Sequence, residues 1–180
     1  MKYAIVYLIK GEPKKYQQKL IKTLAKISNE GYLIDESPIP EHVTLIYPFE
    51  SNKIKKLEDK LNKISKKTNV ASITIKEFGN FHKKVAFLKV LFSKEAKKMQ
   101  KKILYELENE FLLEKYKNFN HRPKPHTTLA YGNTKETFNI IWSYLKSVNK
   151  PNFILKFNNI TILKKPKGKH WQIHKEFKLK

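Results

Sequence analysis

A short sequence motif that occurs twice constrains the fold of this chain more than any other feature. It reads His42-Val43-Thr44-Leu45 and again His126-Thr127-Thr128-Leu129, with a tyrosine two residues beyond each leucine. The two histidines are 126 − 42 = 84 residues apart, so each copy lies near the middle of one half of the 180-residue chain. Such a repeat indicates two similar halves that each contribute the same side chains.

If both copies are strands, their side chains divide between two faces, because alternate residues project in opposite directions. His42 then shares a face with Thr44, and His126 shares a face with Thr128. The other faces are mainly apolar and carry Val43, Leu45 and Tyr47 in one copy and Thr127, Leu129 and Tyr131 in the other. We therefore predict that the two tyrosines are core residues rather than substrate platforms, and that the histidines and threonines face a cleft.

The rest of the chain alternates between strand and helix patterns. Strand patterns cover 2–9, 39–49, 70–78, 85–92, 124–132, 153–157 and 171–179, and helical stripes cover 13–27, 54–64, 93–111 and 138–148. Gly79-Asn80 is a turn signal between two of the strands and predicts a hairpin there. This order favours an α+β fold with antiparallel sheets over a parallel doubly wound sheet. We expect one domain, residues 1–180, with two lobes.

Two histidines and two threonines form a set of groups suited to phosphate-ester chemistry. Histidine titrates near neutrality, so one imidazole can be neutral while its partner is protonated, as paired general base and general acid catalysis requires. Threonine hydroxyls can donate hydrogen bonds to the non-bridging oxygens of a phosphate. His42 and His126 are therefore candidate catalytic residues, and Thr44 and Thr128 are candidate phosphate-binding residues. The sequence leaves open which histidine is the base.

The charge of the chain points to a polyanionic partner. The formal net charge is +22, and all 38 basic residues except Arg122 are lysines. A field of this sign attracts RNA, DNA or an anionic membrane. Lysine contacts phosphate as a point charge, whereas arginine gives planar bidentate recognition. The scarcity of arginine therefore argues against base-specific reading of DNA.

Several functional classes are excluded or disfavoured by composition. The chain has no cysteine, which excludes disulfides, thiolate catalysis and cysteine-ligated zinc. No histidine, aspartate and glutamate trio has metal-site spacing, so we expect neither a metal nor a cofactor. The apolar run from Ala4 to Ile9 is too short for a signal sequence or a membrane span. We therefore expect a cytoplasmic monomer that does not enter the membrane.

The segments 42–49 and 125–131 resemble the two signature strands of the 2H phosphoesterase superfamily, which includes 2′-5′ RNA ligase-like proteins and RNA 2′,3′-cyclic phosphodiesterases. The resemblance spans most of the chain, and 78–90 resembles the strand pair that lies between the two motifs. One departure is Glu41, which precedes the first histidine where proline is frequent.

The resemblance implies a bilobal fold with two antiparallel β-sheets, related by a pseudo-twofold axis around a basic cleft, and helices packed outside. It also implies that His42 and His126 are catalytic and that Thr44 and Thr128 bind phosphate. The expected reaction is metal-independent hydrolysis of 2′,3′-cyclic phosphate ends of RNA, for example of tRNA fragments, or of related cyclic or 2′-5′ phosphodiesters. His121, Arg122 and Lys124, just upstream of the second motif, are candidate RNA contacts at the rim of the cleft.

Two other functions remain open from the sequence. One is the reverse reaction, 2′-5′ ligation of RNA ends. The other is a non-catalytic module that binds phosphorylated RNA ends, although a pure binding protein has no need of two imidazoles. The position of the product phosphate, on the 2′ or the 3′ oxygen, is also open.

Overall fold

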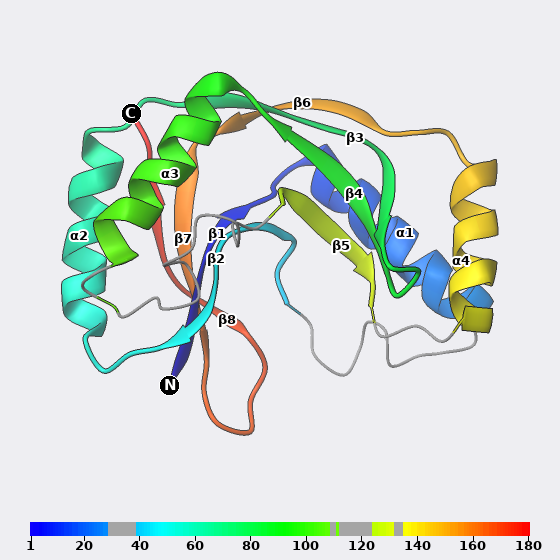
Figure 1. The fold of residues 1–180 in the computed structure, drawn as a ribbon, viewed down its shortest axis with the longest axis horizontal. Helices are drawn as coiled ribbons and strands as arrows, with labels where there is room; N and C mark the ends of the chain where they lie inside the picture. The colour runs from blue at the N-terminus through cyan, green and yellow to red at the C-terminus, as the bar shows by residue number, and fades with distance from the viewer. Residues whose placement is uncertain (29–38, 109–110, 112–123, 132–134) are drawn as a thin grey trace.

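The computed structural model of the chain describes residues 1–28, 39–108, 111, 124–131 and 135–180. The elements along the chain are β1 (Lys2–Leu8), α1 (Glu12–Ser28), β2 (His42–Glu50), α2 (Ile54–Lys66), β3 (Ala71–Phe81), β4 (Val85–Phe92), α3 (Lys94–Glu108), β5 (His126–Ala130), α4 (Lys135–Ser147), β6 (Asn152–Phe157), β7 (Asn159–Lys165) and β8 (Gln172–Lys178). The described strands form two four-stranded sheets, ordered β2-β1-β7-β8 and β5-β4-β3-β6 (Figure 1). All their pairings are antiparallel. The predicted α+β class with two antiparallel sheets is confirmed.

Both motif strands lie at sheet edges, and the two edges meet. Among the described strands, β2 pairs only with β1 and β5 pairs only with β4, and β2 and β5 contact each other. The connecting helices cross over between the sheets. α1 links β1 to β2 but packs against β5 and α4, whereas α3 links β4 to β5 but contacts β2 as well as β3. The fold thus brings residues from the two halves of the sequence to one place.

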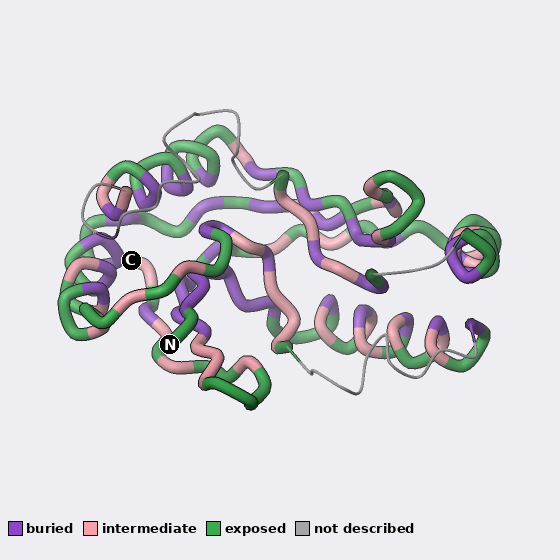
Figure 2. Tube along the Cα trace, turned by 60° about the horizontal axis from the view of Figure 1, so that its bottom comes forward, coloured by how far each residue is buried: buried purple, intermediate pink, exposed green. Residues whose placement is uncertain are grey.

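The core joins the two sheets through aromatic side chains. Phe157 on β6 is fully buried, and its ring lies 5.0 Å from that of Tyr7 on β1 and 5.6 Å from that of Phe92 on β4. Figure 2 shows buried residues concentrated along the central strands, with exposed residues on the outer turns of the helices. A smaller apolar cluster, Ala4, Val6, Leu8 and Leu163, packs under Trp171 on the other face of the β1 sheet.

One strand was missed by the sequence pattern. β7 follows β6 after a single residue, Asn158, and its residues from Asn159 to Leu163 are all buried. It lies inside its sheet, covered on both faces, so it lacks the alternation that marks a half-buried strand. It begins at the buried Asn159, whose amide bonds both the backbone N–H and the carbonyl of Leu8 on β1.

The hairpin between β3 and β4 is real, but its turn is displaced from the predicted one. β3 continues through Gly79 and Asn80 to Phe81, and the chain reverses at 82–84, where His82 and Lys83 have φ of 50° and 54°. Gly79 is instead buried within the strand, where a Cβ would overlap the ring of Phe87. The glycine therefore marks a close approach between strands rather than a turn.

Within the described part of the chain, no helix has the length and apolar character needed to cross a bilayer.

Candidate active site

The two motif histidines have the same local geometry. Each is the first residue of its strand, and each places its Nδ1 2.6 Å from the carbonyl oxygen two residues before it, Pro40 for His42 and Lys124 for His126. A carbonyl oxygen only accepts, so Nδ1 carries the proton in both rings. Nε2 is therefore left to accept a proton in the neutral state and to donate one in the charged state.

The two imidazoles influence each other electrostatically. Burial lowers the pKa of His42 below its ordinary 6.5. The carbonyl of Pro40 opposes this, the charge of His126 lowers the pKa further, and Glu41 raises it. Burial also lowers the pKa of His126, against the carbonyl of Lys124. Protonation of His126 therefore disfavours protonation of His42.

His126 is also packed against two phenylalanine rings. The ring of Phe81 lies 5.0 Å away, nearly perpendicular at 89°, and that of Phe87 lies 5.1 Å away. These apolar rings exclude water from one side of the imidazole and so contribute to the burial that lowers its pKa. They also restrict its rotation, so the Nε2 of His126 has a fixed direction.

The threonines occupy the predicted positions on the strands. Thr44 and Thr128 are half-buried, two residues beyond their histidines, while their neighbours Val43 and Thr127 are almost fully buried. His42 with Thr44 and His126 with Thr128 therefore share faces that are not part of the core. Each strand presents one proton-transfer group and one hydroxyl donor.

The prediction that Tyr47 and Tyr131 are core residues is wrong. Their exposed fractions are 38% and 53%. In both copies the strand pairing skips the motif leucine: Val6 pairs with Thr44 and Ile5 with Ile46, and Phe87 pairs with Thr128 and Ala86 with Ala130. The extra residue is a β-bulge, which reverses the alternation beyond it. Both residues before each tyrosine are therefore buried, and the tyrosine turns outward.

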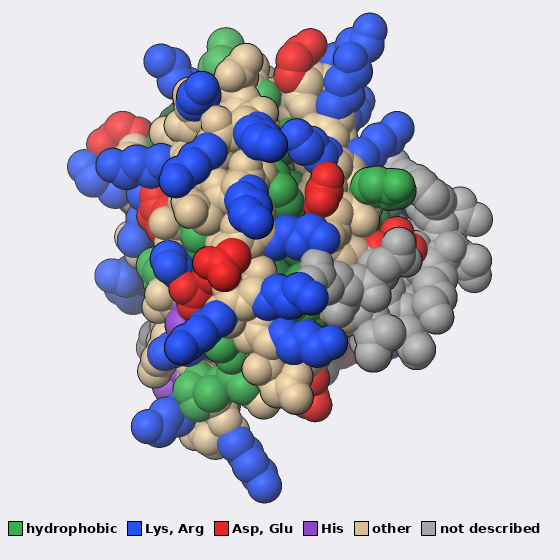
Figure 3. Space-filling view, turned by 90° about the vertical axis from the view of Figure 1, so that its left-hand side faces the viewer, with side chains coloured by type: hydrophobic (Ala, Val, Ile, Leu, Met, Phe, Trp, Pro, Cys, Tyr) green, Lys and Arg blue, Asp and Glu red, His purple; other side chains and the backbone are tan. Residues whose placement is uncertain are grey.

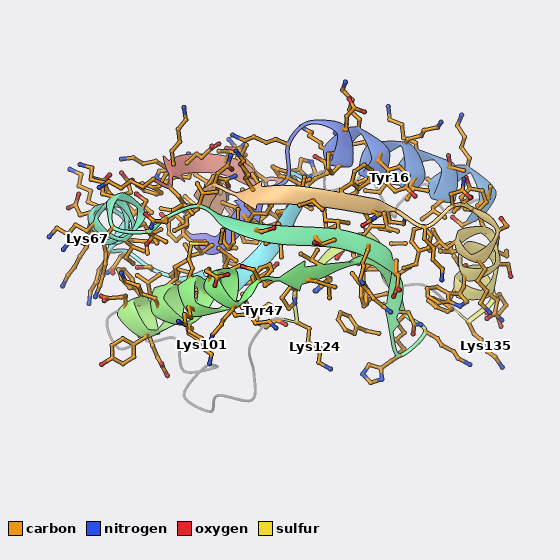
Figure 4. All side chains as sticks on the ribbon, turned by 90° about the horizontal axis from the view of Figure 1, so that it is seen from above. Tyr16, Tyr47, Lys67, Lys101, Lys124 and Lys135 are labelled. Atoms are coloured by element: carbon orange, nitrogen blue, oxygen red, sulfur yellow. The ribbon has the colours of Figure 1, made fainter. Side chains whose placement is uncertain are left out.

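Lys124 is the part of the predicted RNA-contact loop that the structure describes. Its side chain is exposed, and Figure 4 places it on the same side of the molecule as Tyr47, away from Tyr16. His121 and Arg122 lie outside the described residues. Among described residues no group of three or more histidine, aspartate or glutamate side chains is arranged to hold a metal ion.

Sequence reasoning missed Gln17 on α1. Its Nε2 donates to the carbonyl of Thr128 (3.0 Å), and its Oε1 accepts from the hydroxyl of Thr127 (2.9 Å). Only 3% of the residue is exposed. The available signal was its place on the apolar stripe of the helix, in line with Leu20 and Leu24. A polar residue at such a position needs a buried partner.

Comparison with known proteins gives a consistent family. Residues 17–169 match the family model described as the 2′-5′ RNA ligase superfamily. No curated protein sequence matches the chain significantly. Among solved structures, the chain is similar to TT0787 of Thermus thermophilus, with 16% identity, a TM-score of 0.66 and coverage of 99% of this chain and 98% of that one. It is also similar to LigT of E. coli in complex with 3′-AMP, with 14% identity, a TM-score of 0.58 and coverage of 99% and 96%. A structure described as a phosphoesterase has 15% identity, a TM-score of 0.60 and coverage of 99% and 97%.

Proposed function

This chain belongs to the 2′-5′ RNA ligase superfamily, and from that premise we propose that it is a metal-independent phosphoesterase that hydrolyses 2′,3′-cyclic phosphate ends of RNA. One observation carries the proposal. His42 and His126 stand on adjoining edge strands with the same Nδ1 anchor, and each is followed by a threonine on the same face. Paired acid–base catalysis on a phosphodiester needs such a set of groups.

The reaction is an in-line displacement at phosphorus. The Nε2 of one neutral imidazole takes a proton from water, and the water oxygen forms a bond to phosphorus. The bond from phosphorus to one ribose oxygen breaks, and the Nε2 of the other, charged imidazole gives its proton to that oxygen. The hydroxyls of Thr44 and Thr128 donate to the non-bridging oxygens, where charge grows in the transition state. The product is a phosphomonoester, and the two histidines have exchanged protonation states.

Phosphate-bearing ligands in a structural relative add support. LigT of E. coli was crystallised with 3′-AMP, with ATP, with NADP⁺ and with phosphate. These ligands share a phosphate group, and all but inorganic phosphate are nucleotides. A nucleotide phosphate is therefore the substrate group that we assign to this site.

The surface charge favours RNA over a free nucleotide. Lysine side chains cover the face that carries α2 and α3 (Figure 3). Between these helices lies a groove of about 560 Å³, lined mainly by lysines: Lys56, Lys60 and Lys63 on α2, Lys67 directly after it and Lys102 on α3, together with Asp59, Ile64 and Glu106. The first four recur at spacings of 4, 3 and 4, so they form one stripe along α2 and its C-terminal end. Such a surface attracts a phosphate backbone without reading its sequence.

The direct test is incubation with an RNA that ends in a 2′,3′-cyclic phosphate, followed by end-group analysis. We expect conversion to a single phosphomonoester without added metal and in the presence of a chelator. A joined product with a 5′-hydroxyl RNA would show instead that ligation is the main reaction. Tight RNA binding with no product from either the RNA or a cyclic mononucleotide would identify a non-catalytic binding module and overturn the proposal.

The lowered histidine pKa values predict an acidic optimum. The base must be neutral and the acid protonated in the free enzyme, and kcat/KM reports both conditions. Burial lowers both pKa values below the ordinary 6.5. Activity therefore falls as the pH rises through the lowered pKa of the acid, and also at lower pH when the base is protonated. The profile of kcat/KM against pH should be bell-shaped with its maximum below pH 6.5, and a maximum above pH 7 would contradict this.

The lysine groove predicts a difference between long and short substrates. Replacing Lys63, Lys67 and Lys102 by glutamine should raise KM about tenfold for a tRNA-length RNA at low salt, because fewer phosphates are neutralised. KM for a 2′,3′-cyclic mononucleotide should not change. The matched control replaces three lysines of α1 by glutamine. These are Lys19, Lys22 and Lys26, which are aligned along the surface of that helix. Equal effects of the two triple variants would mean that RNA is held by the overall charge rather than by the groove.

A further inference from the structure

The helices that precede the two motif strands are built on the same pattern. Pro13 corresponds to Ala96, 96 − 13 = 83 residues later, and every buried residue of α1 has a buried counterpart at this offset, although α3 also buries Met99 and Leu104. The matched positions are Pro13, Gln17, Leu20, Leu24 and Ser28 in and at the end of α1, and Ala96, Gln100, Ile103, Leu107 and Phe111 in and beyond α3. This offset differs by one residue from the 84 between the motif histidines. Gln17 and Gln100 are therefore counterparts in the two halves.

The two glutamines make unequal contacts. Gln17 reaches the motif strand of the other sheet, where it holds the Thr128 carbonyl and the Thr127 hydroxyl. Gln100 is also buried, with 8% exposed, on a helix that contacts β2. Among the described residues, its Nε2 has no hydrogen-bond partner. The counterpart of Gln17 in the other half is thus present, but its amide nitrogen makes no equivalent hydrogen bond within the described residues.

A difference in the motifs explains the asymmetry. The residue after the histidine is Thr127 in the second copy and Val43 in the first, and both are almost fully buried. Only the threonine offers a hydroxyl to the glutamine Oε1. With this bond in place the amide is fixed so that its N–H₂ faces the Thr128 carbonyl, since a carbonyl can only accept. Val43 cannot fix an amide in this way.

We propose that Gln17 is a positioning residue that holds the second motif strand in the register in which His126 and Thr128 act, and that the first strand lacks this clamp. The inference rests on the proposed function for its kinetic consequence, but its structural part stands independently. β5 has only five residues and lies at a sheet edge, so of the described strands only β4 pairs with it. Gln17 supplies a fixed polar contact from another element to this strand, between the two residues that follow His126.

Replacement by methionine distinguishes the roles of Gln17 and Gln100. Methionine keeps the length and apolar stem of glutamine but removes its donors and acceptor. Gln17→Met leaves the Thr127 hydroxyl and the Thr128 carbonyl without their partner, so β5 should shift. Gln100→Met removes an amide group whose N–H₂ is unpaired, so it serves as the matched control. Thr127→Val gives the second motif the valine that the first motif has at position 43, and Thr127→Ser retains the hydroxyl.

The experiment combines kinetics on a 2′,3′-cyclic mononucleotide with NMR of ¹⁵N-labelled imidazoles. Gln17→Met should lower kcat by about tenfold to a hundredfold, since small displacements of catalytic groups have effects of this size, with KM changed less than about threefold. The ring resonances of His126, and the pH at which they titrate, should move more than those of His42, which respond only through the charge of His126. Thr127→Val should show a smaller effect of the same kind, Thr127→Ser should restore wild-type behaviour, and Gln100→Met should match the wild type.

Each outcome decides the matter. If Gln17→Met and Gln100→Met lower kcat equally, or if the His126 resonances do not move, Gln17 has only a packing role and the inference is wrong. If Gln17→Met does not fold, the comparison of Thr127→Val with Thr127→Ser gives the answer. If the wild-type protein hydrolyses no cyclic phosphate, the proposed function fails, but the NMR comparison still reports whether Gln17 positions His126.

Discussion

Replacing His42 or His126 by alanine is expected to lower kcat on a cyclic phosphate substrate by about 10²- to 10⁴-fold, the usual contribution of a positioned acid or base. Each imidazole is anchored through Nδ1, which leaves its Nε2 as the atom that transfers the proton. Both residues are needed in one reaction cycle, because one histidine takes a proton from the attacking water and the other gives a proton to the leaving ribose oxygen. Loss of either should therefore cost nearly as much as loss of both, since groups that act as a unit are not additive.

The controls for this prediction must separate chemistry from folding. His170→Ala is a matched substitution, because His170 is exposed and lies outside both motifs. It should leave kcat unchanged. Circular dichroism and thermal unfolding should show that His42→Ala and His126→Ala retain the fold. Hydrolysis at near wild-type rates by either motif variant would refute the catalytic roles.

The part of the site that the sequence predicts depends on local periodicity. His42 and Thr44 are two residues apart on a regular strand, and the structure keeps them on one half-buried face. The same holds for His126 and Thr128. No long-range information is needed for this result, because the pleat alone sets which side chains share a face.

The tyrosines show where periodicity fails. A β-bulge adds one residue after each threonine and reverses the alternation of the residues that follow it, as far as each tyrosine. Leu45 and Ile46 are both apolar, so the pattern of apolar and polar residues is the same with and without a bulge. The sequence therefore does not reveal the bulge. The repetition of the bulge at Leu129 indicates that it belongs to the motif itself. It places Tyr47 and Tyr131 outside the core.

The sequence pattern also did not predict contacts between segments that are distant along the chain. Gln17 meets Thr127 across 110 residues, and the rings on His126 come from β3 and β4. These contacts depend on α1 crossing to the other sheet, which local preferences do not encode. β7 was missed for a related reason, because a strand covered on both faces has no alternation to detect.

Replacing Phe157 by alanine should have the largest effect on stability, a loss of about 3–5 kcal/mol in the free energy of unfolding. The side chain is completely buried and touches rings from both sheets, Tyr7 on β1 and Phe92 on β4. The Tyr7 hydroxyl also donates to the Lys156 carbonyl (3.2 Å), and burial raises the pKa of Tyr7 to about 12. A cavity here would weaken the contact that joins β6 to the other sheet.

Urea unfolding of Phe157→Ala, compared with Ile154→Ala, tests this prediction. Ile154 lies on the same strand but is 79% exposed, so its truncation should change the free energy by no more than about 0.5 kcal/mol. A domain typically has only about 5–15 kcal/mol of stability, so the Phe157 variant should unfold at a much lower urea concentration. Similar midpoints for the two variants would mean that the two sheets do not depend on this aromatic contact. Because His42 and His126 stand on different sheets, a weaker contact between the sheets should also disturb the relative position of the two histidines.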